Sequence, residues 1–197
     1  MNQFKRSIKF SVTIAVITFV LAAIFSVISS SILSKVAWMI GIIVVLIIVL
    51  IGVLFDMVGI ASTSANEAPF HAMAAEKVPG AKEAVAIIRN ADKFASFCND
   101  VIGDISGIVS GTASALVVLQ IANIFGESSG SPLEITLSVL MTSIVAALTV
   151  GGKALGKYVA INSSTDIIHF AGRVVSLMET KLKIKILPYN KEKTNDK

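Results

Sequence analysis

The sequence predicts an all-α membrane protein: a bundle of four transmembrane helices, short helices on the cytoplasmic side, and a C-terminal amphipathic juxtamembrane helix. Hydrophobic residues make up 54% of the 197 residues and charged residues only 15%, with a mean hydropathy of +0.81. Soluble domains are about one-quarter charged, so this composition is typical of a membrane protein. Four apolar segments are also long enough to cross a bilayer, which takes roughly 20 residues of helix.

Each apolar segment is expected to be helical, because a lone segment in lipid must satisfy its backbone hydrogen bonds internally. The predicted spans cover about residues 10–33, 37–60, 95–125 and 132–151, and the second contains the unbroken run IGIIVVLIIVLIGVLF. The first could instead be a signal peptide, since MNQFKRSIK resembles a positively charged n-region. Its apolar stretch is longer than that of a signal peptide and no A-x-A cleavage site follows, so we expect a retained helix.

Basic residues indicate which side each loop faces, because short cytoplasmic loops are enriched in Lys and Arg. Outside the spans they gather in three places, the N-terminus, the 61–94 loop and the segment after the fourth span. The two opposite loops hold only Lys35. We therefore expect a multi-pass protein of the cell (inner) membrane with both termini in the cytoplasm. The lipid bilayer is the expected partner of these basic residues, and nucleic acid is not.

Two further segments lie outside the spans. Residues 66–93 are predicted to form short helices broken at Pro79 and Gly80. Residues 153–185 mix apolar and polar side chains without a spanning core, which is typical of an amphipathic helix in the cytoplasmic interface. The chain is thus divided into an extra N-terminal helix (1–36), a transmembrane domain (37–180) and a basic cytoplasmic tail (181–197), whose last residues are expected to be disordered.

The third span carries Asn99, Asp100 and Asp104 near its cytoplasmic end. In an α-helix the two aspartates share one face, about a turn apart. An ionised Asp at the bilayer centre costs roughly 3 kcal/mol, so both must face protein, water or a cation. The same span carries two rows of small residues, which let another helix approach closely. These rows are Gly103, Gly107, Gly111 and Ser106, Ser110, Ser114.

The second span ends in FDMVGIASTSAN, which places a carboxylate and several hydroxyl groups near the same side of the membrane. Carboxylate, hydroxyl and amide oxygens on two neighbouring helix ends are hard ligands that suit Mg²⁺ or Ca²⁺ rather than zinc or copper. The sequence therefore predicts a divalent-cation site. Its candidate ligands are Asp56, Ser62, Ser64, Asn99, Asp100 and Asp104.

Other interpretations of these side chains stay open. Asp100 and Asp104 could form structural ion pairs with Lys153 or Lys157, in which case the chain would be a non-transporting membrane assembly or regulatory subunit. Asp56 near the interface could simply be solvated. The sequence contains neither an H-E-x-x-H nor a P-loop motif, so we expect no enzyme and place intramembrane catalysis last.

The segment IASTSANEAPFHAMAAEKVPGAKEAVAIIRNADKF resembles the membrane domain of the CorB/CorC/cyclin-M (CNNM) family, where a spanning helix ends in an S-x-S-E-x-A-L-x-S-A-N type motif followed by a G-A-K segment. CNDVIGDISG is similar to the family's G-N-N-L-x-N type motif, and GGKALGKYVAI resembles its G-E-x-x-P-K motif. The matching positions are Ala61, Ser64, Ala65, Asn66, Pro79, Gly80, Ala81, Lys82, Gly152, Leu155, Lys157 and Ala160. The resemblance covers about residues 37–180. It implies a homodimeric membrane domain with a divalent-cation site between helices, associated with Mg²⁺ transport.

The chain also departs from the motifs of that family. The acidic residue of the first motif falls on Gly59 and its early Ser on Asp56, while the Glu of G-E-x-x-P-K falls on Lys153. The family continues into cytoplasmic CBS domains that this sequence does not include, so nucleotide regulation is not expected within it. The leading prediction is a Mg²⁺ transporter or a reduced relative of one, in which three aspartates would bind a cation more tightly or couple it to protons.

Overall fold

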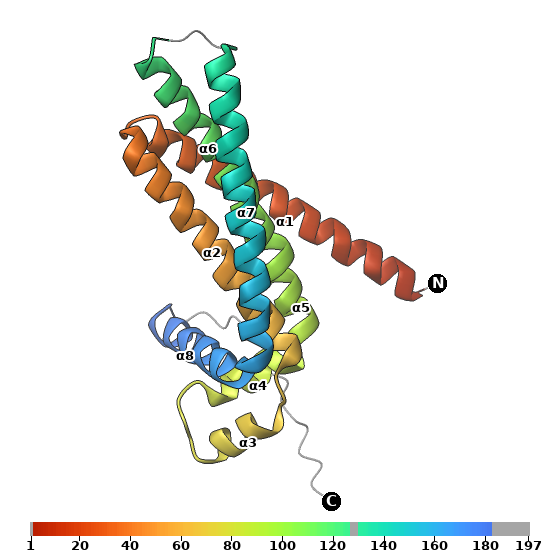
Figure 1. Cartoon of the computed structure of the whole chain (residues 1–197). Coiled ribbons are helices and arrows are strands. Elements are labelled where there is room, and N and C mark those ends of the chain that lie inside the picture. Colours follow the sequence, from red (N-terminus) through yellow and green to blue (C-terminus); the bar gives the residue numbers. More distant parts are fainter. Residues whose placement is uncertain (1, 127–129, 183–197) are drawn as a thin grey trace, which may run out of the picture.

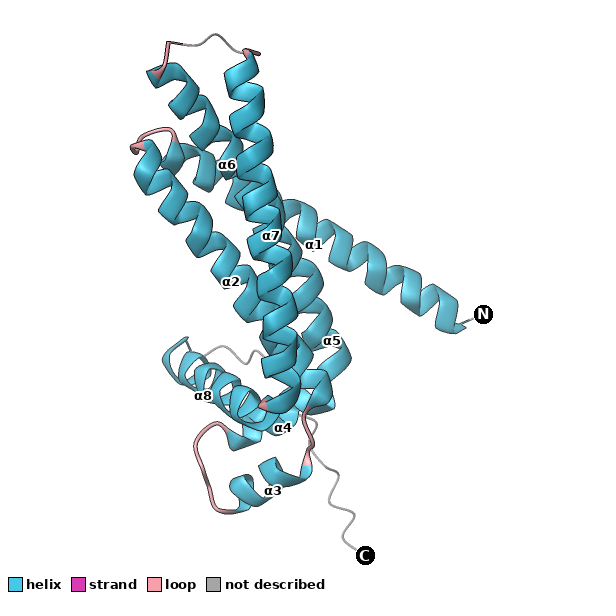
Figure 2. Cartoon of the chain, viewed as in Figure 1, coloured by secondary structure: helices cyan, strands magenta, loops and turns pink. Residues whose placement is uncertain are grey.

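The computed structural model describes residues 2–126 and 130–182, with side chains described for residues 8–126 and 130–181. The described residues form helices without any strand, which confirms the all-α fold (Figure 2). The elements are α1 (Asn2–Leu33), α2 (Trp38–Ser64), α3 (Ala68–Ala75), α4 (Ala81–Arg89), α5 (Ala91–Ser96), the π-helix η1 (Phe97–Gly103), α6 (Asp104–Ile124), α7 (Pro132–Asn162) and α8 (Ser164–Leu182). By length and composition, four helical stretches can cross a membrane: Ile8–Leu33, Trp38–Ser64, Ala91–Ile124 and Pro132–Asn162.

The helices α2, α6 and α7 form the centre of the bundle, while α1 diverges from it toward its N-terminal end (Figure 1). Val49 of α2, Val117 of α6 and Val145 of α7 are buried in one apolar cluster. Leu33, the last residue of α1, is fully buried in the same cluster. The side-chain amide of Gln120 on α6 donates a 2.7 Å hydrogen bond to the carbonyl of Leu33. This bond satisfies one of the carbonyls that a helix end leaves without an intrahelical partner.

Small residues bring α2 and α7 together. A Cβ at Gly152 of α7 would lie 2.9 Å from a methyl carbon of Val53, and one at Gly156 would lie 3.5 Å from the same side chain. Because glycine has no side chain, the α7 backbone can pack directly on the valine, as small residues allow between helices in membranes. This contact sets how Lys153, which lies between the two glycines, is placed relative to α2.

The two predicted small-residue rows of the third span have different surroundings. Ser106, Ser110 and Ser114 are buried, and their hydroxyl groups donate to carbonyl oxygens of their own helix. A Cβ at Gly107 or Gly111 would instead meet open space. The serine row is therefore the packed face within this chain, and the glycine row beyond Gly103 is not.

Several predicted boundaries were wrong. The helix predicted to end near Gly151 continues to Asn162, because Gly151 and Gly152 stay helical where α7 packs against α2. The amphipathic helix predicted from residue 153 therefore begins only at Ser164. The third span begins with α5 at Ala91, before the predicted residue 95. The predicted disorder of the tail concerns residues 183–197, which lie outside the described part of the chain.

A short-helix layer, made of α3, α4 and α8, covers one end of the bundle (Figure 1). Phe70 of α3, Ile87 of α4 and Ile168 of α8 are fully buried in a second apolar cluster, which also includes Ala61 near the end of α2. His169 on α8 makes a 3.2 Å hydrogen bond with the carbonyl of Pro79, just before α4. The short-helix layer is thus packed against the end of α2.

Candidate functional site

The ammonium group of Lys153 on α7 lies between two carboxylates. Its Nζ atom is 3.6 Å from Oδ1 of Asp56 on α2 and 3.6 Å from Oδ1 of Asp104, the first residue of α6. The side chains of Asp56, Lys153 and Asp104 are 14%, 29% and 64% exposed, respectively. Asp56 is the most shielded of the three, so it gains most from the ammonium, because a shielded carboxylate needs a nearby counter-ion.

These three residues lie at one level of the bundle. Asp56 follows Trp38, Asp104 precedes Ile124 and Lys153 follows Pro132, each by about 20 residues, or about 30 Å of helix. This length matches the hydrocarbon thickness of a bilayer. The charged side chains therefore lie toward the end of α2 and the start of α6, on the side of the bundle where the chain continues into the short helices.

The structure brings together only some of the predicted cation ligands. Asp56 and Asp104 share Lys153, as described above. The Ser62 hydroxyl is buried and donates a 2.7 Å hydrogen bond to the carbonyl of Gly59. Ser64 and Asp100 are exposed, and no contact in the described chain joins them to Lys153.

Asn99 is the most unusual of the predicted ligands. Its side-chain Oδ1 atom is buried and has no hydrogen-bond partner. A Cβ at Gly59 would overlap this oxygen and would lie 2.8 Å from Asn99 Cγ, so the amide rests directly on the α2 backbone. Buried polar atoms are normally paired, and an unpaired one calls for an explanation such as a functional role.

A π-helix shapes the segment that carries Asn99 and Asp100. The element η1 covers Phe97–Gly103, and α6 begins with Asp104. The segment that carries Asp100 was expected to be α-helical, but it is a π-helix, which has a wider turn with i→i+5 hydrogen bonds. Single π-helical turns often occur at functional sites.

A metal ligand set does not form among the described side chains: no three His, Cys, Asp or Glu residues lie together where they could hold an ion. The divalent-cation site therefore stays a prediction. Asp104 and Lys153 form an ion pair, which is one of the alternatives that the sequence left open. Lys157, the other possible partner, is exposed.

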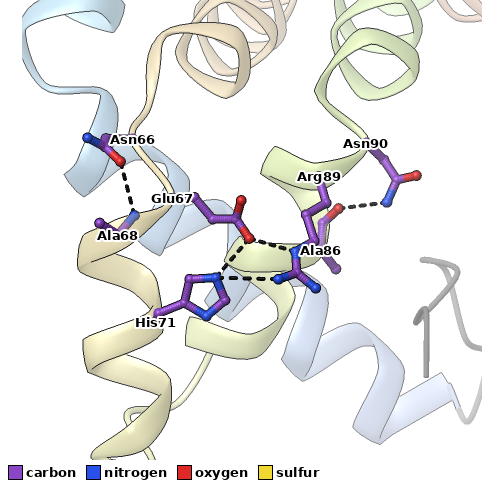
Figure 3. A network of polar contacts seen from close by, with 7 residues as sticks. All are labelled: Asn66, Glu67, Ala68, His71, Ala86, Arg89 and Asn90. Atoms are coloured by element: carbon purple, nitrogen blue, oxygen red, sulfur yellow. Dashed lines mark hydrogen bonds and ion pairs between the residues drawn. The ribbon is translucent and has the colours of Figure 1, made fainter. Parts of the chain in front are cut away.

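A second polar cluster, which the sequence reasoning missed, lies in the short-helix layer (Figure 3). The Oε1 atom of Glu67 accepts a 2.6 Å hydrogen bond from Nε of Arg89 and lies 2.8 Å from Nε2 of His71. The spacing of four residues between Glu67 and His71 on one helical turn could have indicated their contact. Arg89 comes from α4, so only the folded chain shows that it joins them.

The carboxyl of Glu67 gives the short-helix layer a pH dependence. The hydrogen bond from Arg89, and next that from His71, hold the pKa of Glu67 below its ordinary value of 4.5. A depressed pKa contributes stability that is present above pH 4.5 and is lost as the pH falls through the folded-state value. In thermal melts of the full chain in detergent from pH 6 to pH 3, we expect stability to decline below about pH 4.5.

The Glu67→Gln variant should lack the part of this decline that Glu67 causes. The matched variant Glu76→Gln, which changes an exposed carboxyl at the end of α3, should keep the wild-type profile. A Glu67→Gln variant with the same acid sensitivity as the wild type would assign the decline to other carboxyl groups.

Comparison of the chain with protein-family models, with curated proteins and with solved structures finds no match.

Proposed function

We propose that this protein is a non-transporting membrane assembly or regulatory subunit, in which Lys153 serves as a built-in counter-ion for the acids of the spanning helices. The observation that carries this proposal is the position of the Lys153 ammonium, 3.6 Å from both Asp56 and Asp104. A protein cation in this place supplies the positive charge that a bound metal would supply. It also repels a divalent cation that approaches the same carboxylates.

A departure from the motifs of the CorB/CorC/cyclin-M family supports this proposal. Lys153 stands where the motif of that family has a Glu, so a negative charge is replaced by a positive one. Lys153 of α7 links α2 and α6 through its contacts with Asp56 and Asp104. A bundle that is linked in this way suits a subunit that assembles with, or regulates, another membrane protein.

Removing the ammonium tests the proposal. The Lys153→Met variant should lose about 1–2 kcal/mol of stability, because it leaves the shielded carboxylate of Asp56 without its counter-ion; complete burial would cost more. The double variant with Asp56→Asn should recover most of the loss, since neither charge remains. The measurement is a thermal melting series of the full chain in detergent, with and without millimolar Mg²⁺.

The proposal requires that the wild-type protein melts at the same temperature with and without Mg²⁺. Asp100→Asn is the control for Asp56→Asn, because it makes the same change at an exposed aspartate that lies outside the Lys153 pairing. A loss of stability in Lys153→Met that Asp56→Asn does not relieve would contradict the counter-ion role.

A second candidate function is Mg²⁺ transport, and it is favoured by the unpaired oxygen of Asn99. A cation that displaced Lys153 would find the Asp56 and Asp104 carboxylates, and a rearranged Asn99 could add its amide oxygen. Binding would then raise the stability of the wild-type protein by RT ln(1 + [L]/Kd), and Asp56→Asn would abolish this increase. Mg²⁺ flux into liposomes that contain the purified chain distinguishes transport from binding alone.

We further propose that the protein resides in the cell (inner) membrane and that the short-helix layer faces the cytoplasm, because the opposite loops hold Lys35 as their one basic residue. Two cysteine variants test this orientation, both in a Cys98→Ala background since Cys98 is the single cysteine. An impermeant thiol reagent added to intact cells should label Lys35→Cys, in the exposed turn between α1 and α2. It should label Lys82→Cys, on α4, only after the cells are opened, and the reverse pattern would invert the topology.

A further inference from the structure

The helix α8 has a wide apolar surface, of which one part is buried and another part is exposed. One face is buried in the short-helix layer, where Ile168 and Ala171 pack in the cluster with α4 and the end of α2. The other face carries four large apolar side chains that are each at least 40% exposed. This outer stripe consists of Phe170, Val174, Leu177 and Met178. Spacings of four, three and one residues place all four on one side of an α-helix.

The position of α8 brings the outer stripe close to the membrane. Only Ser163 separates the end of α7 from the start of α8. In Figure 1, α8 runs steeply across the direction of α7 at the end of the bundle that carries the short-helix layer. One connecting residue spans at most about 3.6 Å, so α8 must stay next to the end of a membrane-spanning helix.

The residues beside the outer stripe fit a bilayer surface. Arg173 is exposed on one flank of the stripe, and Lys181 is exposed at its C-terminal end. Long cationic side chains at such borders can place their apolar stems in the membrane interface and their charges among the headgroup phosphates. His169 and Thr180 lie on the same flank as Arg173. On this side of α8, the polar flank lies between the outer stripe and the buried face.

We propose that the outer stripe of α8 inserts into the headgroup–acyl boundary of the bilayer that the long helices span. The short-helix layer is then held between the end of α2 and the membrane surface. The lipid interface completes the burial of α8, which α4 covers on the opposite face. This inference does not depend on the role of Lys153.

A single-tryptophan experiment tests the insertion. Trp38 is the one tryptophan of the chain, so Trp38→Phe provides a background without tryptophan. Leu177→Trp then reports on the outer stripe, and Thr180→Trp, three residues further on, reports on the polar flank. Each full-length variant is reconstituted in phosphatidylcholine vesicles, with and without lipid brominated near the headgroup end of its acyl chains.

Bromolipid should quench Leu177→Trp at least about twofold more strongly than Thr180→Trp, and water-soluble acrylamide should show the opposite order. Equal quenching of the two variants by bromolipid would overturn the proposal. Protection of Leu177→Trp from acrylamide that disappears as the protein is diluted with lipid would also overturn it, because a second copy of the chain would then cover the stripe. Unchanged thermal melting of both variants ensures that the comparison concerns folded protein.

Discussion

Replacing Gly172 by alanine should detach α8 from α4. Gly172 faces backbone atoms: an added Cβ would overlap the carbonyl oxygen of Gly80 and would lie 2.9 Å from the backbone nitrogen of Ala84. Backbone atoms cannot rotate away as the end of a flexible side chain can, so the two helices must separate.

We expect Gly172→Ala to lower the stability of the packing between α4 and α8 by about 3 kcal/mol, which is at the upper end of the usual range for overpacked sites. Backbone amide hydrogen exchange of the full chain in detergent measures the effect for each helix separately. Protection in α4 and α8 should fall about 100-fold, while the protection of α2, α6 and α7 should change little.

Gly111→Ala is the matched control, since a Cβ at Gly111 would meet nothing within 4 Å. It should leave the exchange of every helix at the wild-type rate. If Gly172→Ala also left the protection of α8 unchanged, the close crossing of α8 over the start of α4 would be wrong.

Replacing Gly59 by alanine should have the second-largest effect, because it forces Asn99 off the α2 backbone. The added Cβ would overlap Asn99 Oδ1 and would approach the Cβ of Cys98 to 3.1 Å. The amide can rotate, but the backbone of η1 that carries Cys98 must also move. We expect a loss of about 2 kcal/mol in the free energy of unfolding, measured by denaturation of the full chain in detergent.

A double-mutant cycle identifies the cause of this loss. Asn99→Ala alone should cost little from hydrogen bonding, since its Oδ1 atom has no partner to lose. In the Asn99→Ala background, Gly59→Ala should cost at least about 1 kcal/mol less than in the wild type, because neighbouring residues are energetically coupled. Equal costs in both backgrounds would show that the clash with Asn99 does not determine the effect.

Much of the fold follows from composition alone. The runs near Val45 in α2 and Val145 in α7 are too apolar for a soluble chain, and a lone apolar segment in lipid can only be helical. The sequence also predicted that the aspartates of the third span must face protein, water or a cation, and it named Lys153 among their possible partners. The mixed apolar and polar pattern near the C-terminus also predicted the helix α8, although its start was placed eleven residues too early.

The sequence alone therefore predicts the set of spanning helices and the need of the third-span carboxylates for protein, water or a cation beside them. The contact of Lys153 with both Asp56 and Asp104 follows from the fold and not from the sequence pattern, because it depends on how closely Gly152 lets α7 approach α2. The tertiary structure also decided that Asn99 lies in a π-helix against Gly59, and that the serine row rather than the glycine row is buried. Solvation by lipid acts on each segment separately, so the spanning helices can be predicted from the local sequence. The rotation and register of one helix against another depend on contacts between residues far apart in the chain.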